Sequence, residues 1–187
     1  MPQPTGRPNA RLGKAMTDMV RSMAIVMGVI AAILLVTWRP QPDAVRVVPV
    51  DQQLILAQMQ AEFPVLTTAG LSDDWRSTSA RWESTPASGI EPVWHVGYVT
   101  PSDQYLQFTQ VAAGDPAGAE LGAFVAEQTV EGSTSGSVEI DGQLWEKWES
   151  SERRSLVLLD TESVTVVSGT GDWAEVESYV AALTLAE

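Results

Sequence analysis

The sequence of 187 residues contains no cysteine and one histidine. The lack of cysteine excludes structural disulfides, thiolate chemistry, iron–sulfur clusters and lipidation at an N-terminal cysteine. A zinc site needs several cysteine or histidine ligands, and the acidic residues lack the alternating spacing of a calcium loop. No Walker, HExxH or GxSxG motif is present. We therefore predict that the protein holds no metal and no cofactor.

Basic residues are scarce after residue 46, where five lysines and arginines stand against 22 acidic residues. The net charge of this part is about −17. Such a surface repels the phosphate backbone of nucleic acids at ordinary salt concentrations. We therefore expect no nucleic-acid partner.

Only one long apolar run is present, SMAIVMGVIAAILLVTW at residues 22–38, and it contains no charged residue. This run predicts an N-terminal transmembrane helix that follows a basic leader at residues 1–21. A cleaved signal peptide is the alternative. The run is longer than a usual signal-peptide core, and no A-x-A-like cleavage site follows it, so an uncleaved anchor is favoured.

The charges around this run predict its orientation. Basic residues before the run outnumber those just after it, which predicts a cytoplasmic N-terminus and an extracytoplasmic C-terminal domain. The predicted location is the cell membrane, with a single pass. Ala24, Gly28 and Ala32 form a stripe of small residues that is compatible with a weak homodimer, although chance alignment is the favoured explanation because alanine and glycine are common in such helices.

The remainder divides into a Pro-containing linker at residues 39–50 and an extracytoplasmic domain at residues 51–187. A helix is predicted from Asp51, with Ile55, Met59 and Phe63 on its inner face and Pro64 at its end. Three strands follow, at residues 75–83, 93–100 and 104–111.

Helices and strands are also predicted in the second half of the domain. Asp115-Pro116 predicts a helix start, and Asp141-Gly142 predicts a two-residue hairpin loop. Strands are expected at residues 155–160 and 163–169. A last helix is expected from Asp172 to the end, with Leu183 on its inner face. Short turns favour antiparallel pairing, so the predicted fold class is α+β, an antiparallel sheet packed with helices.

Four segments carry a resemblance to a known family: WRSTSAR at residues 75–81, WHVGYVTP at residues 94–101, Gly142 with Trp145, and the closing VTVVSGTG. In these segments the chain resembles an actinobacterial family known only as a domain of unknown function (DUF family 4245). The resemblance implies a short leader, a single-pass membrane helix and an outer domain, and it implies no activity. The order of elements is also similar to Mog1/PsbP-like domains, which is an analogy of fold alone.

The candidate binding residues are His95, Trp94 and Tyr98 in the WHVGYVTP segment. Catalysis by His95 needs a nucleophile and an orienting acid nearby, and the sequence shows neither. A structural role is the alternative for His95, as core packing is for most of the tryptophans. We therefore predict no catalytic residue.

Two classes of function remain open. The favoured one is a non-enzymatic, membrane-tethered binding or accessory domain of the cell envelope, with an envelope protein or a glycan as partner. The alternative is an envelope enzyme of the hydrolase type that uses His95 or a pair of carboxylates. A concave pocket that contains His95 or two acids would favour the enzyme.

Overall fold

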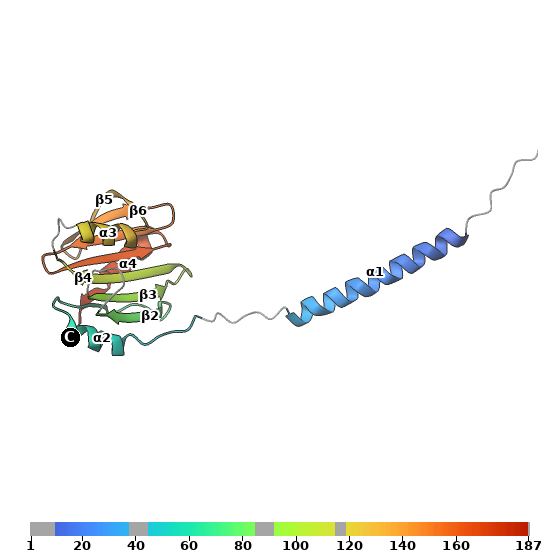
Figure 1. The fold of residues 1–187 in the computed structure, drawn as a ribbon, viewed down its shortest axis with the longest axis horizontal. Helices are drawn as coiled ribbons and strands as arrows, with labels where there is room; N and C mark the ends of the chain where they lie inside the picture. Colours follow the sequence, from blue (N-terminus) through green and yellow to red (C-terminus); the bar gives the residue numbers. More distant parts are fainter. Residues whose placement is uncertain (1–9, 38–44, 85–91, 115–118, 187) are drawn as a thin grey trace, which may run out of the picture. The chain divides into compact units, whose positions relative to one another are not determined.

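A computed structural model describes residues 10–37, 45–84, 92–114 and 119–186 (Figure 1). The contacts between Cα atoms divide the chain into two compact units, Met1–Ala44 and Val45–Glu187. The buried hydrophobic residues of both core clusters belong to the second unit. Val45–Glu187 therefore carries a complete core of its own, as an independently folding domain does.

The first unit contains one helix, α1 (Ala10–Thr37). In the described part of the chain, no helix combines the length and the apolar character needed to cross a membrane. The predicted transmembrane helix at residues 22–38 is therefore wrong. Its charge-free part within α1 runs from Ser22 to Thr37 and is about 24 Å long at 1.5 Å per residue. This length is less than the hydrocarbon core of a membrane, which is about 30 Å thick. Before Ser22 the same helix continues through Arg21 and further charged residues.

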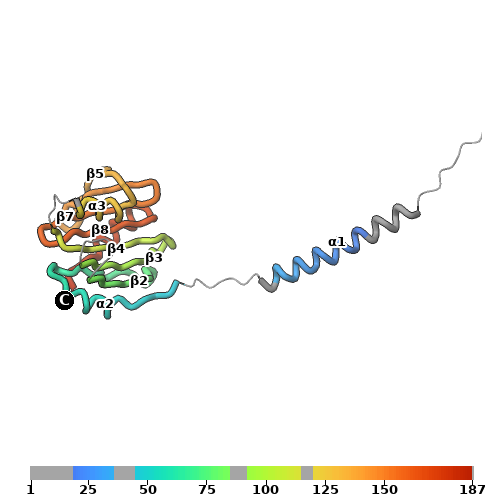
Figure 2. The backbone as a smooth tube through the Cα atoms, viewed as in Figure 1, coloured from blue at the N-terminus to red at the C-terminus, as the bar shows by residue number. Residues whose placement is uncertain are grey.

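The second unit is built on a seven-stranded sheet in which every neighbouring pair is antiparallel (Figures 1 and 2). This confirms the α+β class and the antiparallel sheet. In spatial order, the strands are β2 (Arg76–Glu83), β3 (Val93–Val99), β4 (Tyr105–Ala112), β8 (Ser163–Gly169), β7 (Arg154–Leu159), β6 (Gln143–Glu149) and β5 (Ser133–Ile140).

A second, two-stranded sheet pairs β1 (Leu66–Thr68) with β9 (Leu183–Leu185) in antiparallel register. We call it the β1–β9 ribbon. The prediction of a helix that runs to the chain end is wrong here. The last helix, α4 (Trp173–Ala181), stops at Ala181, and Leu183 begins a strand instead of extending the inner face of the helix.

Both faces of the large sheet are covered. On one face, α2 (Asp51–Gln60), α4 and the ribbon pack over a cluster that includes Trp94, Phe108 and Val167. On the other face, α3 (Ala119–Gln128) packs over a smaller cluster of mainly valines. Since β8 lies at the centre of the sheet, every residue of that strand is buried, whichever face it points to.

Two local predictions are confirmed. Asp141 and Gly142 have φ values of 50° and 77°, as the two central residues of a primed hairpin turn require. Asp172 caps α4, because its carboxylate accepts a hydrogen bond of 3.0 Å from the backbone N–H of Glu175. The predicted helix start at Asp115-Pro116 lies outside the described residues.

The inner face predicted for α2 is wrong. Ile55 and Met59 are 55% and 77% exposed, whereas Ala57 is fully buried. Helix α2 packs through Leu54 and Ala57, which share a face one turn apart. Ile55, Met59 and Phe63 are spaced four residues apart, as residues on one helix face are. Of these three, only Phe63 lies in the core, and it follows the end of the helix.

Candidate functional site

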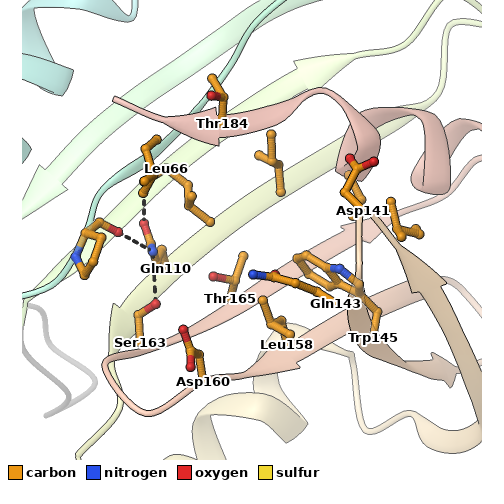
Figure 3. A pocket seen from close by; sticks show the side chains of 15 residues that line it. Leu66, Gln110, Asp141, Gln143, Trp145, Leu158, Asp160, Ser163, Thr165 and Thr184 are labelled. Carbon is orange, nitrogen blue, oxygen red and sulfur yellow. Dashed lines mark hydrogen bonds between the residues drawn. The ribbon is translucent and has the colours of Figure 1, made fainter. Parts of the chain in front are cut away.

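A pocket of about 380 Å³ lies between the large sheet and the β1–β9 ribbon (Figure 3). Its volume is within the lower range of small-molecule sites. The floor comes from β4, β8, β7 and β6, and the opposite wall comes from the ribbon and the end of α4. The apolar lining consists of Pro64, Leu66, Ile140, Trp145, Leu158, Val180, Leu183 and Leu185.

Polar residues of the floor include Gln110 on β4, Ser163 and Thr165 on β8, and Gln143 on β6. Gln110 lies directly opposite Thr165 in the sheet register. Side chains alternate between faces along a strand, so Gln110, Ser163 and Thr165 point to the same face as Phe108 and Val167, which fill the core farther along. Along β4 and β8, the pocket therefore begins where polar side chains take the place of the large apolar side chains of the core.

Gln110 connects the floor to the ribbon. Its Nε2 donates to the carbonyl oxygen of Pro64 at 2.9 Å and to Ser163 Oγ at 3.1 Å. Its Oε1 accepts from the backbone N–H of Leu66 at 3.0 Å, and these bonds are drawn in Figure 3. Because both amide protons of this buried side chain are used, Gln110 fixes the position of β1 and is a positioning residue.

Thr165 differs from Gln110. It is 1% exposed, and its Oγ1 has no hydrogen-bond partner among the described residues. An unpaired buried hydroxyl costs about 1–3 kcal/mol relative to a satisfied one. A valine of the same shape would avoid this cost, so stability alone does not explain a threonine at this position. Thr165 is the feature of the lining that points most directly to a ligand.

Among the described residues that line the pocket, the charged ones are two aspartates, Asp141 and Asp160, and none is a lysine, arginine or histidine. Asp141 belongs to the β5–β6 turn, and Asp160 follows β7. Figure 3 shows them at two different sides of the floor. Both are exposed, and Asp160 Oδ1 accepts a hydrogen bond of 2.7 Å from the N–H of Thr161. We call these two carboxylates the acidic rim.

Trp94 and Tyr98 lie on the α4 side of the sheet but outside the pocket lining. Trp94 is buried, and its Nε1 donates to the carbonyl oxygen of Leu66 at 2.9 Å. The hydroxyl of Tyr98 lies 3.2 Å from Thr68 Oγ1. Both side chains thus form hydrogen bonds to strand β1 of the ribbon. Their predicted role in binding stays a prediction.

His95 points to the other face of the sheet, toward α3. Its Nδ1 lies 3.3 Å from Thr109 Oγ1, which donates to Gln128 Oε1. Burial, and to a smaller extent the positive charge of Arg81, together lower the pKa of His95 from 6.5 to about 4. His95 is therefore neutral at neutral pH, and the pocket doesn't include it. Its predicted binding role also stays a prediction.

The predicted stripe of Ala24, Gly28 and Ala32 lies on α1, and all three residues are exposed. The homodimer that this stripe suggests stays a prediction. Within the described ranges, no group of three or more acidic or histidine side chains is arranged to hold a metal ion.

The sequence contains one weak signal for the pocket, in strand β8. In SVTVVSG, the serine and threonine alternate with valines, which is typical of a strand with a solvent-facing side. The polar side is instead covered, because the ribbon packs over it. That covering depends on the pairing of β1 with β9, two three-residue strands from opposite ends of the domain.

The model of a family described as "Protein of unknown function (DUF4245)" matches residues 11–183. No curated protein and no solved structure matches the chain. The actinobacterial origin and the likeness to Mog1/PsbP-like domains stay predictions.

Proposed function

This chain belongs to the DUF4245 family, and we propose that its folded unit, Val45–Glu187, is a non-enzymatic domain that binds a small amphipathic molecule in the pocket between the sheet and the ribbon. The observation that carries the proposal is the unpaired, buried hydroxyl of Thr165 in the lining of a 380 Å³ cavity. Polar groups in a mostly apolar concave lining are typical of small-molecule sites.

The size of the pocket limits the ligand. A water molecule in the liquid takes about 30 Å³, so the cavity has room for about a dozen groups of that size. The ligand is therefore comparable to a medium-chain alkyl compound. The apolar lining, with Trp145 and Leu158 in the floor, supplies the favourable burial of such a chain.

A hydrolase is less well supported by this geometry. The two carboxylates of the acidic rim are exposed, whereas the general acid of a glycosidase is typically desolvated by an apolar environment. His95 is a weak base with its pKa near 4. Neither Thr109, its hydrogen-bond partner, nor Gln128, which accepts a hydrogen bond from Thr109, provides an orienting carboxylate. Both observations favour binding over catalysis.

A titration with 1-octanol tests the proposal, with backbone amide NMR signals as the readout. The full chain and Val45–Glu187 are both measured. We expect saturable shifts at residues of the lining, among them Trp145, Leu158 and Thr165. Shifts spread evenly over the exposed surface, or no saturable shift, would contradict the proposal.

Two neighbouring substitutions on β6 provide a matched pair for this titration. Gln143 lines the pocket, whereas Leu144 points to the opposite side and is exposed. We expect Gln143→Trp to fill part of the pocket and weaken octanol binding. Leu144→Trp adds the same side chain outside the pocket and should leave binding unchanged.

The location of the protein at the cell membrane, with the domain outside the cytoplasm, stays a prediction from the sequence, as does an envelope protein or glycan as partner. A reporter that is active only outside the cytoplasm, fused after Glu187, tests the location. An inactive reporter in a stable fusion would contradict it.

A further inference from the structure

The lining of the pocket changes in polarity from its buried part to its exposed part. The buried lining residues, each no more than 7% exposed, form what we call the deep end: Gln110, Trp145, Ser163, Thr165 and Val180. The exposed lining residues form the mouth and include Asp141, Asp160 and Leu185. The deep end thus offers an amide and two hydroxyls but no charge, whereas the carboxylates lie at the mouth.

This arrangement indicates both the chemical class of the ligand and its orientation. Resting on the proposed function, we propose that the ligand is an uncharged amphiphile that binds with its polar head group in the deep end. The head group carries an alcohol or amide oxygen, which accepts a hydrogen bond from the hydroxyl of Thr165. The apolar chain extends from there toward the mouth.

Thr165 is the hydrogen-bond donor of the deep end that the protein leaves unused. Gln110 already donates both amide protons, to the carbonyl oxygen of Pro64 and to Ser163 Oγ. Thr165 Oγ1 is buried and has no partner among the described residues. Figure 3 shows Thr165 in the floor between Gln110 and Gln143, as the order of the strands requires. A ligand oxygen beside Thr165 supplies the missing partner.

The lack of charge in the deep end excludes an ionic head group there. A carboxylate or an ammonium group would lose its water and find no opposite charge, which costs far more than the burial of a hydroxyl or an amide. A charged head group held at the mouth would instead place an alkyl chain against Thr165 and leave the hydroxyl unpaired. Only an uncharged head group avoids both costs.

The position of the apolar chain follows from the leucines of the lining. Leu66, Leu158 and Leu183 are only partly buried, and Leu185 is 59% exposed. A chain that runs from Thr165 toward the mouth covers these side chains and removes apolar surface from water. The apolar contact thus lies outside the deep end, where the head group is bound.

Substitution of Thr165 tests the hydrogen bond to the head group. Affinities for 1-octanol, octanamide and octylamine are measured by calorimetry at pH 7 on the full chain and on Val45–Glu187. Thr165→Val keeps the shape of the side chain and removes its hydroxyl. We expect this variant to bind 1-octanol and octanamide about five-fold more weakly, as the loss of one neutral hydrogen bond predicts. Its affinity for octylamine, whose charged end stays at the mouth, should not fall.

Thr129→Val is the control for this measurement. Thr129 is also fully buried, but it lies outside the pocket lining, and its hydroxyl donates to the carbonyl oxygen of Val125. The same substitution there should leave the affinities for all three probes unchanged.

Intermolecular NOEs from 1-octanol test the orientation. We expect the methylene group next to the hydroxyl to contact the methyl group of Thr165, and the terminal methyl group to contact Leu185. The reverse pattern, or equal affinity of wild type and Thr165→Val for 1-octanol, would overturn this inference while the binding pocket stands. If none of the probes binds, the proposed function fails and the inference fails with it.

Discussion

Threonine at position 165 shows how a single residue can mark a site. Its neighbours Val164, Val166 and Val167 are all buried valines in the same strand. Valine and threonine have nearly the same shape, so the strand would accept valine at position 165 as well. The hydroxyl leaves an unpaired polar atom in the lining of a cavity, and sites of function often keep such locally unfavourable choices.

Thr165→Val is therefore predicted to stabilise the domain. The change removes an unsatisfied buried hydroxyl, so the free energy of unfolding should rise by about 1 kcal/mol. Chemical denaturation of Val45–Glu187 measures this change.

Thr129→Val is the matched control. Thr129 is fully buried, and its hydroxyl donates to the carbonyl oxygen of Val125 at 2.8 Å. Loss of this bond should lower the free energy of unfolding by about 1 kcal/mol. If Thr165→Val destabilised the domain as Thr129→Val does, Thr165 would be a satisfied core residue and the account of the pocket would lose its main support.

A second prediction at this scale concerns His95 and pH. The unfolded chain binds a proton on His95 below about pH 6.5, whereas the folded domain binds it only near pH 4. The contribution of His95 to stability is thus lost as the pH falls from 6.5 toward 4. At pH 5 the loss should be roughly 2 kcal/mol relative to pH 7.5.

Because many carboxylates also titrate in this range, the informative quantity is the difference between the wild type and His95→Gln. We expect denaturation curves at several pH values to show a smaller acid-induced loss of stability in the variant, by about 2 kcal/mol at pH 5. A pH-independent difference between the two proteins would contradict the burial of a neutral His95.

At the scale of elements, local rules predicted the parts of the fold that depend on neighbouring residues. The Asp141-Gly142 turn and the Asp172 cap are set by two to four consecutive residues, and both were predicted correctly. The β1–β9 ribbon depends on register between Leu66 and Leu185, far apart in sequence. No local pattern encodes that pairing, so the ribbon, and with it the pocket, was not predictable.

The exposed face of α2 has a related explanation. Periodicity shows which residues share a face, but the choice between two apolar stripes depends on the neighbouring element. Leu54 and Ala57 face β2 and the core, so Ile55 and Met59 remain outside. For α1, the prediction of a transmembrane helix was wrong: the helix begins at Ala10, so that charged residues precede its apolar part.

Removal of β9 tests the role of the ribbon. A chain that ends at Ala182 loses Leu183 and Leu185 from the pocket wall and the hydrogen bond from the N–H of Ala186 to Val65. We expect the domain to remain folded, with about 1–2 kcal/mol less stability because these leucines are only partly buried. Octanol binding should disappear.

The control for this truncation is a chain that ends at Ala186, which keeps the ribbon and removes only the last residue. Circular dichroism and the octanol titration are measured on both. Octanol binding that survives the removal of β9 would show that the ribbon is not part of the site.

At the scale of the whole molecule, the division at residues 44 and 45 predicts independent folding. Both hydrophobic clusters belong to Val45–Glu187, so this unit should unfold in one cooperative transition without α1. A chelator should leave the melting temperature unchanged, since stability here comes from core packing. A broad, non-cooperative transition, or a marked effect of the chelator, would contradict this prediction.

The central claim is that a small amphipathic ligand occupies the pocket between the sheet and the ribbon. Intermolecular NOEs between 1-octanol and Val45–Glu187 test it most directly. The account predicts contacts from the alkyl protons to Trp145, Leu158 and Val180, which line the pocket. Contacts confined to Ile55 and Met59 on the exposed face of α2 would contradict it, because they would show only adsorption to apolar surface.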